Sequence, residues 1–257
     1  MITSKDNSAV KALKKRIAQP RRADERMVIE GVHAAQMYMA HVGKPLVCWV
    51  AESACALLEV QTLIAQMPCN VVYVSDAVFR DMSGLAQGVS LLLEVARPNG
   101  AQLPAEIDNI VLLDGLQDAG NMGSILRSAA AAGVRDVVLN AACVNPFSPK
   151  VLRASVGAHF ALNIIEVPDL HATVAQAQQQ RVAVVVTSSH ATHSIYAQNL
   201  RQPVAWLLGS EGAGVAPDLM ALANACVTIP MAAGESLNVA AAAAVCLFEM
   251  QRQQSGF

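Results

Sequence analysis

The sequence is poor in aromatic and in charged residues. Aromatic side chains make up 4% of the 257 residues and charged side chains 15%, whereas hydrophobic residues make up 54%. Because a disordered chain lacks the apolar surface that offsets the entropy lost on ordering, this composition excludes an intrinsically disordered protein. The scarcity of rings leaves mostly Ala, Val and Leu, which favour closely packed helices. At about 150 residues per domain, the length allows one large domain or two smaller ones.

Long apolar runs and a secretory signal are also missing. The longest uninterrupted apolar run, residues 239–248, is half as long as the about 20 residues that a bilayer-crossing helix needs. The N-terminal stretch MITSKDNS has no apolar core of a signal peptide. We therefore expect a cytoplasmic protein without a membrane partner.

Metal and nucleotide motifs are absent as well. The six cysteines form no Cys-x-x-Cys pair, and we expect them to be buried small hydrophobic residues. His190 and His193 form a His-x-x-His pair without a third ligand nearby, so we interpret this stretch as a loop and expect no metal. Residues 209–214 (GSEGAG) match neither a dinucleotide fingerprint nor a nucleophile elbow, and no phosphate-binding P-loop exists. Classical dinucleotide enzymes and serine hydrolases are therefore disfavoured.

Positive charge is concentrated at the N-terminus. Residues 1–22 contain seven Lys and Arg and one Asp, a balance of +6, whereas the rest of the chain contains 11 basic and 19 acidic residues, a balance of −8. A basic arm on an acidic body is typical of proteins that contact nucleic acid, and a solvated, frayed terminus is the alternative interpretation. Because the body is acidic, any RNA contact must be local.

Residues 23–97 predict a small α/β domain. The expected helices lie at 27–40, 53–66 (with Ser53 as the N-cap) and 76–83, and the expected strands at 46–50, 70–74 and 90–95. The polar stretch RPNGAQLP that follows is rich in turn-forming residues, which indicates a linker at 98–108.

Residues 109–257 predict a second, larger α/β domain. The expected strands lie at 110–113, 137–139, 161–165, 182–187, 204–208 and 226–229. The expected helices lie at 123–132, 149–155, 170–179, 216–223 and 237–251. Strands separated by helices imply a mainly parallel sheet that is covered on both faces.

Residues 112–129 form the first of three segments that lie where predicted strands end, the usual place for ligands in open α/β sheets. A strand runs into a polar loop and then into a helix. Asn121 lies where it could cap that helix, and Arg127 follows one and a half turns later among small and apolar residues. Taken alone, the segment fits a functional pair and a surface arginine beside an N-cap equally well.

The second and third segments are glycine-rich and polar, respectively. Residues 206–215 (WLLGSEGAGV) place Glu211 among three glycines, which permit positive φ and close approach of the backbone to a ligand. Residues 227–238 run from a strand to an Ala-rich helix, with Ser236 as a candidate N-cap and Asn238 in the first turn. An ordinary glycine turn and an ordinary helix cap are the alternative interpretations.

Together the three segments resemble the signature motifs of the SpoU (TrmH) family of RNA ribose 2′-O-methyltransferases, in the SPOUT class. They agree with it in order, spacing and residue type: Asn-x-Gly-x-x-x-Arg from Asn121, Leu-Gly-x-Glu-Gly from Leu208, and Ile-Pro-Met from Ile229 followed by Ser-Leu-Asn from Ser236. The resemblance covers residues 109–257.

The N-terminal domain carries a second resemblance. Residues 23–97, with Glu30-Gly31 early and Gln87-Gly88-Val89 late, are similar to the substrate-binding domain often fused ahead of this catalytic domain. Its presence favours ribosomal RNA over transfer RNA as the substrate. A transfer-RNA ribose methyltransferase and a non-catalytic RNA-binding protein of the same fold are the alternatives, and the intact set of motif residues argues against the latter.

The resemblance also implies a fold, a cofactor and an assembly. The fold is a parallel α/β sheet whose C-terminal part is tied in a deep trefoil knot. S-adenosylmethionine is the implied methyl donor, and the implied assembly is a homodimer whose site forms at the interface, with Arg127 reaching the cofactor of the other subunit. Carried over by position, the cofactor pocket uses Thr187, Gly209, Ile229, Met231 and Leu237.

The same carry-over assigns five polar residues to the reaction centre: Asn121, Arg127, Glu211, Ser236 and Asn238. Arg153, in the stretch RASVGA, resembles a further segment near the point where RNA enters. We expect Asn121 and Glu211 to orient Arg127. Because a guanidinium is a poor base at neutral pH, Arg127 is either a strongly perturbed base or a bidentate clamp on an RNA phosphate.

Overall fold

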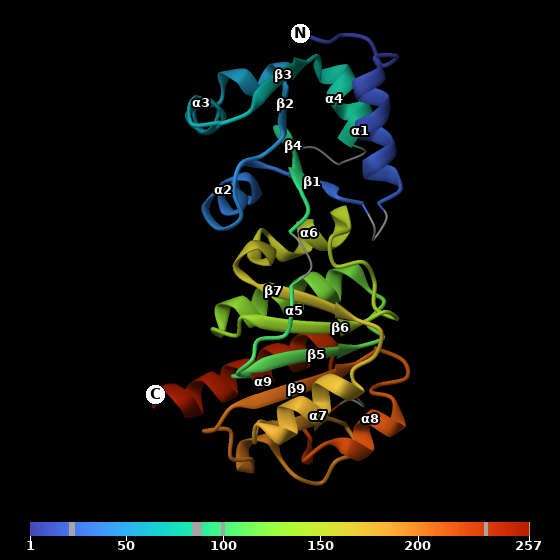
Figure 1. The fold of residues 1–257 in the computed structure, drawn as a ribbon, viewed down its shortest axis with the longest axis vertical. Helices are drawn as coiled ribbons and strands as arrows, with labels where there is room; N and C mark the ends of the chain where they lie inside the picture. Colours follow the sequence, from blue (N-terminus) through green and yellow to red (C-terminus); the bar gives the residue numbers. More distant parts are fainter. Residues whose placement is uncertain (21–23, 84–88, 99–100, 234–235, 257) are drawn as a thin grey trace. The chain divides into compact units, whose positions relative to one another are not determined.

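The chain folds into two compact units, each built around one β-sheet (Figure 1). The computed structural model describes all residues except 21–23, 84–88, 99–100, 234–235 and 257. The first unit consists of residues 1–99 and 147–160, and the second of residues 100–146 and 161–257. The sequence places residues 147–160 in the domain 109–257, whereas their contacts place them with the first unit.

A mixed sheet of four strands forms the first unit, in the order β1-β4-β2-β3. β2 and β3 are parallel, and β4 is antiparallel to both β1 and β2. The strands are β1 (Arg26–Glu30), β2 (Val47–Ala51), β3 (Asn70–Val74) and β4 (Leu91–Ala96). The helices are α1 (Ser8–Ala18), α2 (Val32–His41), α3 (Leu58–Ala65), α4 (Asp76–Ser83) and α6 (Pro149–Ser155), with short 3-10 turns η1 (Glu52–Ala56) and η2 (Ala158–Ala161).

The helix predicted at 27–40 is wrong in its first part. β1 occupies Arg26–Glu30, the chain turns at Gly31 with a φ of 86°, and α2 begins only at Val32. In β1, Met27 lies opposite Val95 of β4. The apolar spacing of this segment suits a helix, but the pairing with a distant strand decides its structure.

The helix predicted at 53–66 is interrupted. Leu57 is extended between η1 and α3, so Ser53 lies in η1 and caps no α-helix. The N–H and the hydroxyl of Ser53 donate instead to Asp76 Oδ1, over 3.1 and 2.8 Å. A hydrogen bond to the start of α4 has replaced the predicted cap.

The N-terminal segment is built into the first unit. Ile2 forms a parallel bridge to Val74 of the edge strand β3. In α1, Val10 and Leu13 are fully buried, and the helix packs against α4 and β1. The alternative of a frayed terminus is therefore wrong for this helix.

The basic residues of this segment are largely paired inside the unit. Four cations have carboxylate partners: Lys5 and Lys14 with Asp81, Lys11 with Asp6, and Arg16 with Glu94. Glu94 is buried and also accepts a hydrogen bond from the Trp49 indole over 3.0 Å. Arg21 and Arg22 lie outside the described residues. The pairing argues against a free arm that binds nucleic acid through charge alone.

Six parallel strands form the sheet of the second unit, in the order β10-β8-β9-β5-β6-β7. They are β5 (Ile110–Asp114), β6 (Asp136–Asn140), β7 (Asn163–Val167), β8 (Ala183–Thr187), β9 (Val204–Gly209) and β10 (Ala225–Val227). The helices are α5 (Ala119–Ala131), α7 (His171–Gln179), α8 (Pro217–Leu222) and α9 (Val239–Ser255), with a short η3 (Ile195–Ala197). The predicted α/β fold with a parallel sheet is confirmed.

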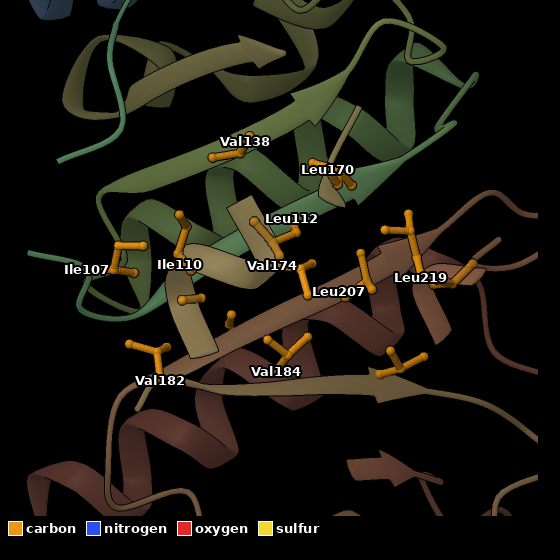
Figure 2. Close-up of a cluster of buried hydrophobic side chains, with 14 of the residues drawn as sticks. Ile107, Ile110, Leu112, Val138, Leu170, Val174, Val182, Val184, Leu207 and Leu219 are labelled. Carbon is orange, nitrogen blue, oxygen red and sulfur yellow. The ribbon is translucent and has the colours of Figure 1, made fainter. Parts of the chain in front are cut away.

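Buried aliphatic side chains hold α7 and α8 against one face of this sheet. Figure 2 shows Leu170 and Val174 close to Leu112 and Leu207 of the strands, and Leu219 of α8 lies in the same cluster. Burying each such side chain stabilises the fold by about 1.5–3 kcal/mol. Because side chains alternate along a strand, residues next to these face the opposite side, where α5 and α9 pack together.

The three sequence segments follow the carboxyl ends of β5, β9 and β10, and in a parallel sheet these ends lie on the same side. From β5 the chain moves outward through β6 and β7, and β9 then pairs with the other side of β5. Ligands bind where the direction of winding reverses, beyond the carboxyl ends of the strands. Among the described residues, every helix is too short or too polar to cross a bilayer.

Candidate functional site

A pocket of about 290 Å³ opens at the carboxyl ends of β8, β9 and β10. Its wall consists of residues at or just after the ends of these strands and of residues at the start of α9. The five residues assigned to the cofactor, Thr187, Gly209, Ile229, Met231 and Leu237, all lie in its wall, together with Glu211, Ser236 and Asn238. This volume is close to the lower end of the about 300–1,000 Å³ found for small-molecule sites.

Glycine sterics shape the loop that carries Glu211. Ser210 and Gly214 exchange two backbone hydrogen bonds, over 3.1 and 3.0 Å, and Gly214 has a φ of 70°. A Cβ at Gly209 would lie 2.0 Å from the carbonyl carbon of Gly214. No residue with a side chain fits there without displacing the loop. The close approach that the structure shows is between two backbone segments of the chain, whereas the predicted approach to a ligand stays a prediction.

The helix α5 begins four residues earlier than predicted. Asp118 is its N-cap and accepts the N–H of Asn121 over 2.7 Å. The prediction that Asn121 caps the helix is therefore wrong, since a carboxylate three residues upstream already accepts this hydrogen bond. The side chain of Asn121 is left for longer-range contacts.

The cap of α9 is Asn238 and not Ser236. Asn238 Oδ1 accepts the N–H groups of Ala240 and Ala241, over 2.9 and 3.3 Å, and α9 begins at Val239. Ser236 was the expected cap, and it lies instead in the pocket wall. Glu235, which precedes it in the motif, lies outside the described residues.

One chain of hydrogen bonds joins the three motifs. Asn238 Nδ2 donates to Asn121 Oδ1 over 3.0 Å, and Asn121 Nδ2 donates to Glu211 Oε1 over 2.7 Å. The direction follows from the cap, because the Asn238 oxygen already accepts from α9 and only its NH₂ group can donate to Asn121. The last bond ends on a carboxylate and is therefore the strongest of the set.

Arg127 lies apart from this chain of hydrogen bonds. Six residues after Asn121 on a helix correspond to about 9 Å along the axis and about 120° around it. The Arg127 side chain is exposed, and within the described part of the chain it makes no hydrogen bond or ion pair. The bonds of Asn121 and Glu211 go to each other, so they do not orient Arg127 as we expected.

Arg153 belongs to the first unit. Its Nε donates to Glu30 Oε2 over 3.1 Å, and the Glu30 side chain is buried. Burial raises the pKa of the Glu30 carboxyl, and the nearby Arg153 charge opposes this rise. Glu30-Gly31 was one of the pairs that carried the second resemblance, whereas Gln87 and Gly88 lie outside the described residues.

Sequence reasoning missed several residues of the site. Ser188, Ser189 and Thr228 line the pocket beside predicted members, and buried Asp114 is hydrogen-bonded to half-buried Asn140 next to the motif loops. The available signal was a polar residue at or just after the end of an apolar strand. In the part of the chain that the structure describes, no cluster of three or more His, Cys, Asp or Glu could hold a metal ion.

Comparison with known proteins identifies the family. Residues 108–248 match the SpoU rRNA Methylase family, which is more than half of the chain. The chain belongs to the SpoU family. The matched range begins just before β5 and ends within α9, so it includes all three motifs and the residues that line the pocket.

Individual SpoU relatives cover different shares of the chain. The 23S rRNA (guanosine-2′-O-)-methyltransferase RlmB of Pseudomonas putida is 32% identical over 239 residues, 88% of this SpoU chain and 96% of that protein. An uncharacterized tRNA/rRNA methyltransferase of Synechocystis sp. is 40% identical over 145 residues, and the match covers 56% of this chain and about half, 53%, of that relative. The crystal structure of an AdoMet-bound rRNA methyltransferase from Sinorhizobium meliloti has a TM-score of 0.85 at 25% identity, covering 98% and 97% of the two chains.

Proposed function

We propose that this SpoU protein transfers a methyl group from S-adenosylmethionine to the 2′-oxygen of a ribose in ribosomal RNA. The observation that carries the proposal is the hydrogen-bonded chain Glu211–Asn121–Asn238, which joins three motifs beside one pocket. The names of the relatives support the reaction and the substrate class. Because ribosomal RNA is the proposed substrate, we also propose a cytoplasmic location.

The pocket fits the proposed cofactor. Its wall combines apolar side chains for a ring system with backbone and hydroxyl groups for polar atoms. Leu237 is 42% exposed, an apolar side chain on the pocket wall that a ligand would cover. Ile229 and Met231 lie on the same wall. Gly209 also lines the pocket, and a side chain there would collide with the backbone of Gly214.

The residues of the chain position the reactants. S-adenosylmethionine, when bound, supplies a methyl group that its sulfonium already activates. The protein must hold the ribose oxygen in line with it and help the proton leave, and positioning of this kind lowers a barrier by about 7–11 kcal/mol in favourable cases. Asn121, Glu211 and Asn238 are linked to one another by hydrogen bonds in this arrangement, and Ser236 adds a hydroxyl at the pocket wall.

Arg127 is assigned to the RNA. Its exposed guanidinium offers donors in a planar fork that match a phosphate bidentately, and no described residue of the chain occupies them. Of the two roles open to Arg127, we therefore propose the phosphate clamp.

We also propose that the protein forms a homodimer and that its chain contains the trefoil knot that the family resemblance implies. Arg127 lies on α5, which packs beside α9, and Phe248 of α9 is 47% exposed. Two neighbouring helices that expose an aromatic ring and an unpaired guanidinium suit a surface that a second copy covers, so that Arg127 serves the site of the other subunit. Light scattering of the purified protein measures this assembly, and a monomer at all concentrations would contradict it.

Arg127→Ala tests the assignment. We expect single-turnover methyl transfer to ribosomal RNA to fall by roughly 100-fold or more, with affinity for S-adenosylmethionine retained in calorimetry. Rates near wild type would contradict the role of Arg127. A wild-type protein that binds RNA and ignores S-adenosylmethionine would indicate a non-catalytic RNA-binding protein. Mapping ribose methylation in total RNA, with and without the protein, separates ribosomal from transfer RNA.

A further inference from the structure

A buried carboxylate ends the strand β5. The side chain of Asp114 lies at the carboxyl edge of the sheet, and the residue is only 9% exposed. A buried carboxylate is unfavourable unless hydrogen bonds replace its hydration. Asp114 Oδ1 accepts Asn140 Nδ2 over 2.6 Å, and Oδ2 accepts the N–H of Ala216 over 2.8 Å. Asp114 is not part of the pocket wall, and its carboxylate instead binds two other groups of the chain, Asn140 and Ala216.

Ala216 closes the loop that carries Glu211. The loop leaves the sheet at Gly209, which lies opposite Asp114 in the β5–β9 ladder, and returns at Ala216, directly before α8. The N–H of Ala216 precedes the helix and donates to Asp114. The Asp114 carboxylate therefore holds the far end of this loop, while the ladder holds its near end.

Asn140 extends the link to the loop of the first motif. It is the last residue of β6, and its Oδ1 accepts the N–H of Gly115 over 3.1 Å. Gly115 has a φ of 64° and starts the loop that leads to α5 and Asn121. Asp114 and Asn140 thus link the ends of β5 and β6 to the loop that follows β9, and the loops of the first and second motifs emerge from β5 and β9.

We propose that Asp114 is a positioning residue for methyl transfer, because its carboxylate sets the loop 210–216 so that Glu211 meets Asn121. The inference rests on the proposed function for its catalytic readout. The chemistry of the site requires a carboxylate, since both partners of Asp114, an NH₂ group and a backbone N–H, are donors. An asparagine at this position would offer one acceptor and turn an NH₂ group toward a donor.

The same pairing of donors and acceptors predicts that a double variant restores what each single variant loses. In Asp114→Asn, the Asn140 amide can turn over so that its oxygen accepts from the new NH₂ group. Its own NH₂ group then faces the N–H of Gly115, so two donors oppose each other. In Asn140→Asp, two carboxylates would face each other. In the double variant Asp114→Asn/Asn140→Asp every donor again faces an acceptor: the new amide donates to the new carboxylate, which also accepts from Gly115, and the amide oxygen accepts from Ala216.

The experiment compares the two single variants with the double variant in the full-length protein. We expect each single variant to lower kcat at least about tenfold with KM for RNA nearly unchanged, because misplaced catalytic groups lower the rate of the chemical step more than RNA binding. We expect the double variant to recover most of the loss. A matched control is Asp136→Asn, which alters a similar Asp–Asn pair, Asp136 with Asn163, at the opposite ends of β6 and β7, and should leave kcat unchanged.

Hydrogen exchange at the Ala216 amide supplies a readout that does not depend on activity. We expect this amide to exchange faster in Asp114→Asn and to return toward the wild-type rate in the double variant. Single variants with the kcat and the Ala216 exchange of wild type would overturn the inference, as would a double variant no better than the sum of the two singles. If the wild type transfers no methyl group, the proposed function fails, and the exchange measurement still decides whether Asp114 holds the loop.

Discussion

Replacing Asn121 by aspartate tests the hydrogen-bonded chain at its centre. Asn121 Nδ2 donates to Glu211 Oε1 over 2.7 Å, so Asn121→Asp would place two carboxylates in contact. At a separation of about 3 Å, two unit charges repel by about 1.4 kcal/mol in a water-like dielectric and by about 5 kcal/mol at an effective dielectric of 20. Because Glu211 is exposed, the lower figure applies.

The lost hydrogen bond adds to this repulsion. A hydrogen bond to a charged group contributes about 1.5–3 kcal/mol, so with the repulsion of about 1.4 kcal/mol the two effects together amount to at least about 3 kcal/mol. Where the contact is needed in the transition state, this corresponds to a roughly 100-fold slower methyl transfer. Asn121→Ala loses the hydrogen bond without adding a charge, and we expect a roughly tenfold slower reaction.

The pH dependence identifies the cause. In Asn121→Asp, protonating one carboxylate at lower pH removes the repulsion and restores an O–H donor, so the rate relative to wild type should rise as the pH falls. Single-turnover rates across a pH series measure this ratio, and Gln179→Glu, a charge change on an exposed position of α7, serves as the control. An aspartate variant no slower than the alanine variant, or a rate ratio that does not change with pH, would refute the reasoning.

Three further predictions concern the loop, the N-terminal helix and the end of α9. Gly209→Ala should abolish measurable binding of S-adenosylmethionine in calorimetry, because its Cβ would lie 2.0 Å from Gly214. Leu13→Ala should lower the free energy of unfolding by about 2–5 kcal/mol in urea titrations, since this side chain is fully buried, whereas a free arm would show no change. A hydrogen bond from Arg252 lowers the pKa of Glu249 to about 2, so this pair stabilises the fold above the usual Glu pKa of 4.5, and the stabilisation is lost as the pH falls toward 2. Arg252→Gln should therefore lower stability at pH 7 and leave it nearly unchanged near pH 2, and an equal loss at both would contradict the pairing.

The central strands of the parallel sheet could be predicted because β5 and β9 are short apolar runs buried on both faces. Runs such as Ile110–Asp114 and Val204–Gly209 need no partner to be recognised. The segment around Met27 shows the limit of this reasoning, because its apolar spacing suits a helix and its pairing with β4 makes it a strand. A pattern of side chains indicates burial, but it does not indicate which distant strand is available.

The motif residues were also visible in the sequence, whereas their contacts were not. The family resemblance, carried by the order and spacing of the three motifs, predicted a cofactor set of five residues, and all five line one pocket. The caps were assigned to the wrong residues, Asn121 and Ser236, because a cap is decided by backbone geometry within one turn. That Asp118 and Asn238 are the N-caps becomes clear only once the first residues of α5 and α9 are known.

By itself, the sequence determined the α/β class, the family and the residue types that meet at the pocket, because these depend on local runs and on motifs within short stretches. The tertiary structure alone decided that residues 147–160 join the first unit, that Asn121 links Glu211 to Asn238, and that Asp114 holds a loop about 100 residues further along the chain. The physical reason is that hydrogen bonds across the edge of a parallel sheet join residues whose separation in sequence carries no signal, and only the order of the strands brings them within 3 Å.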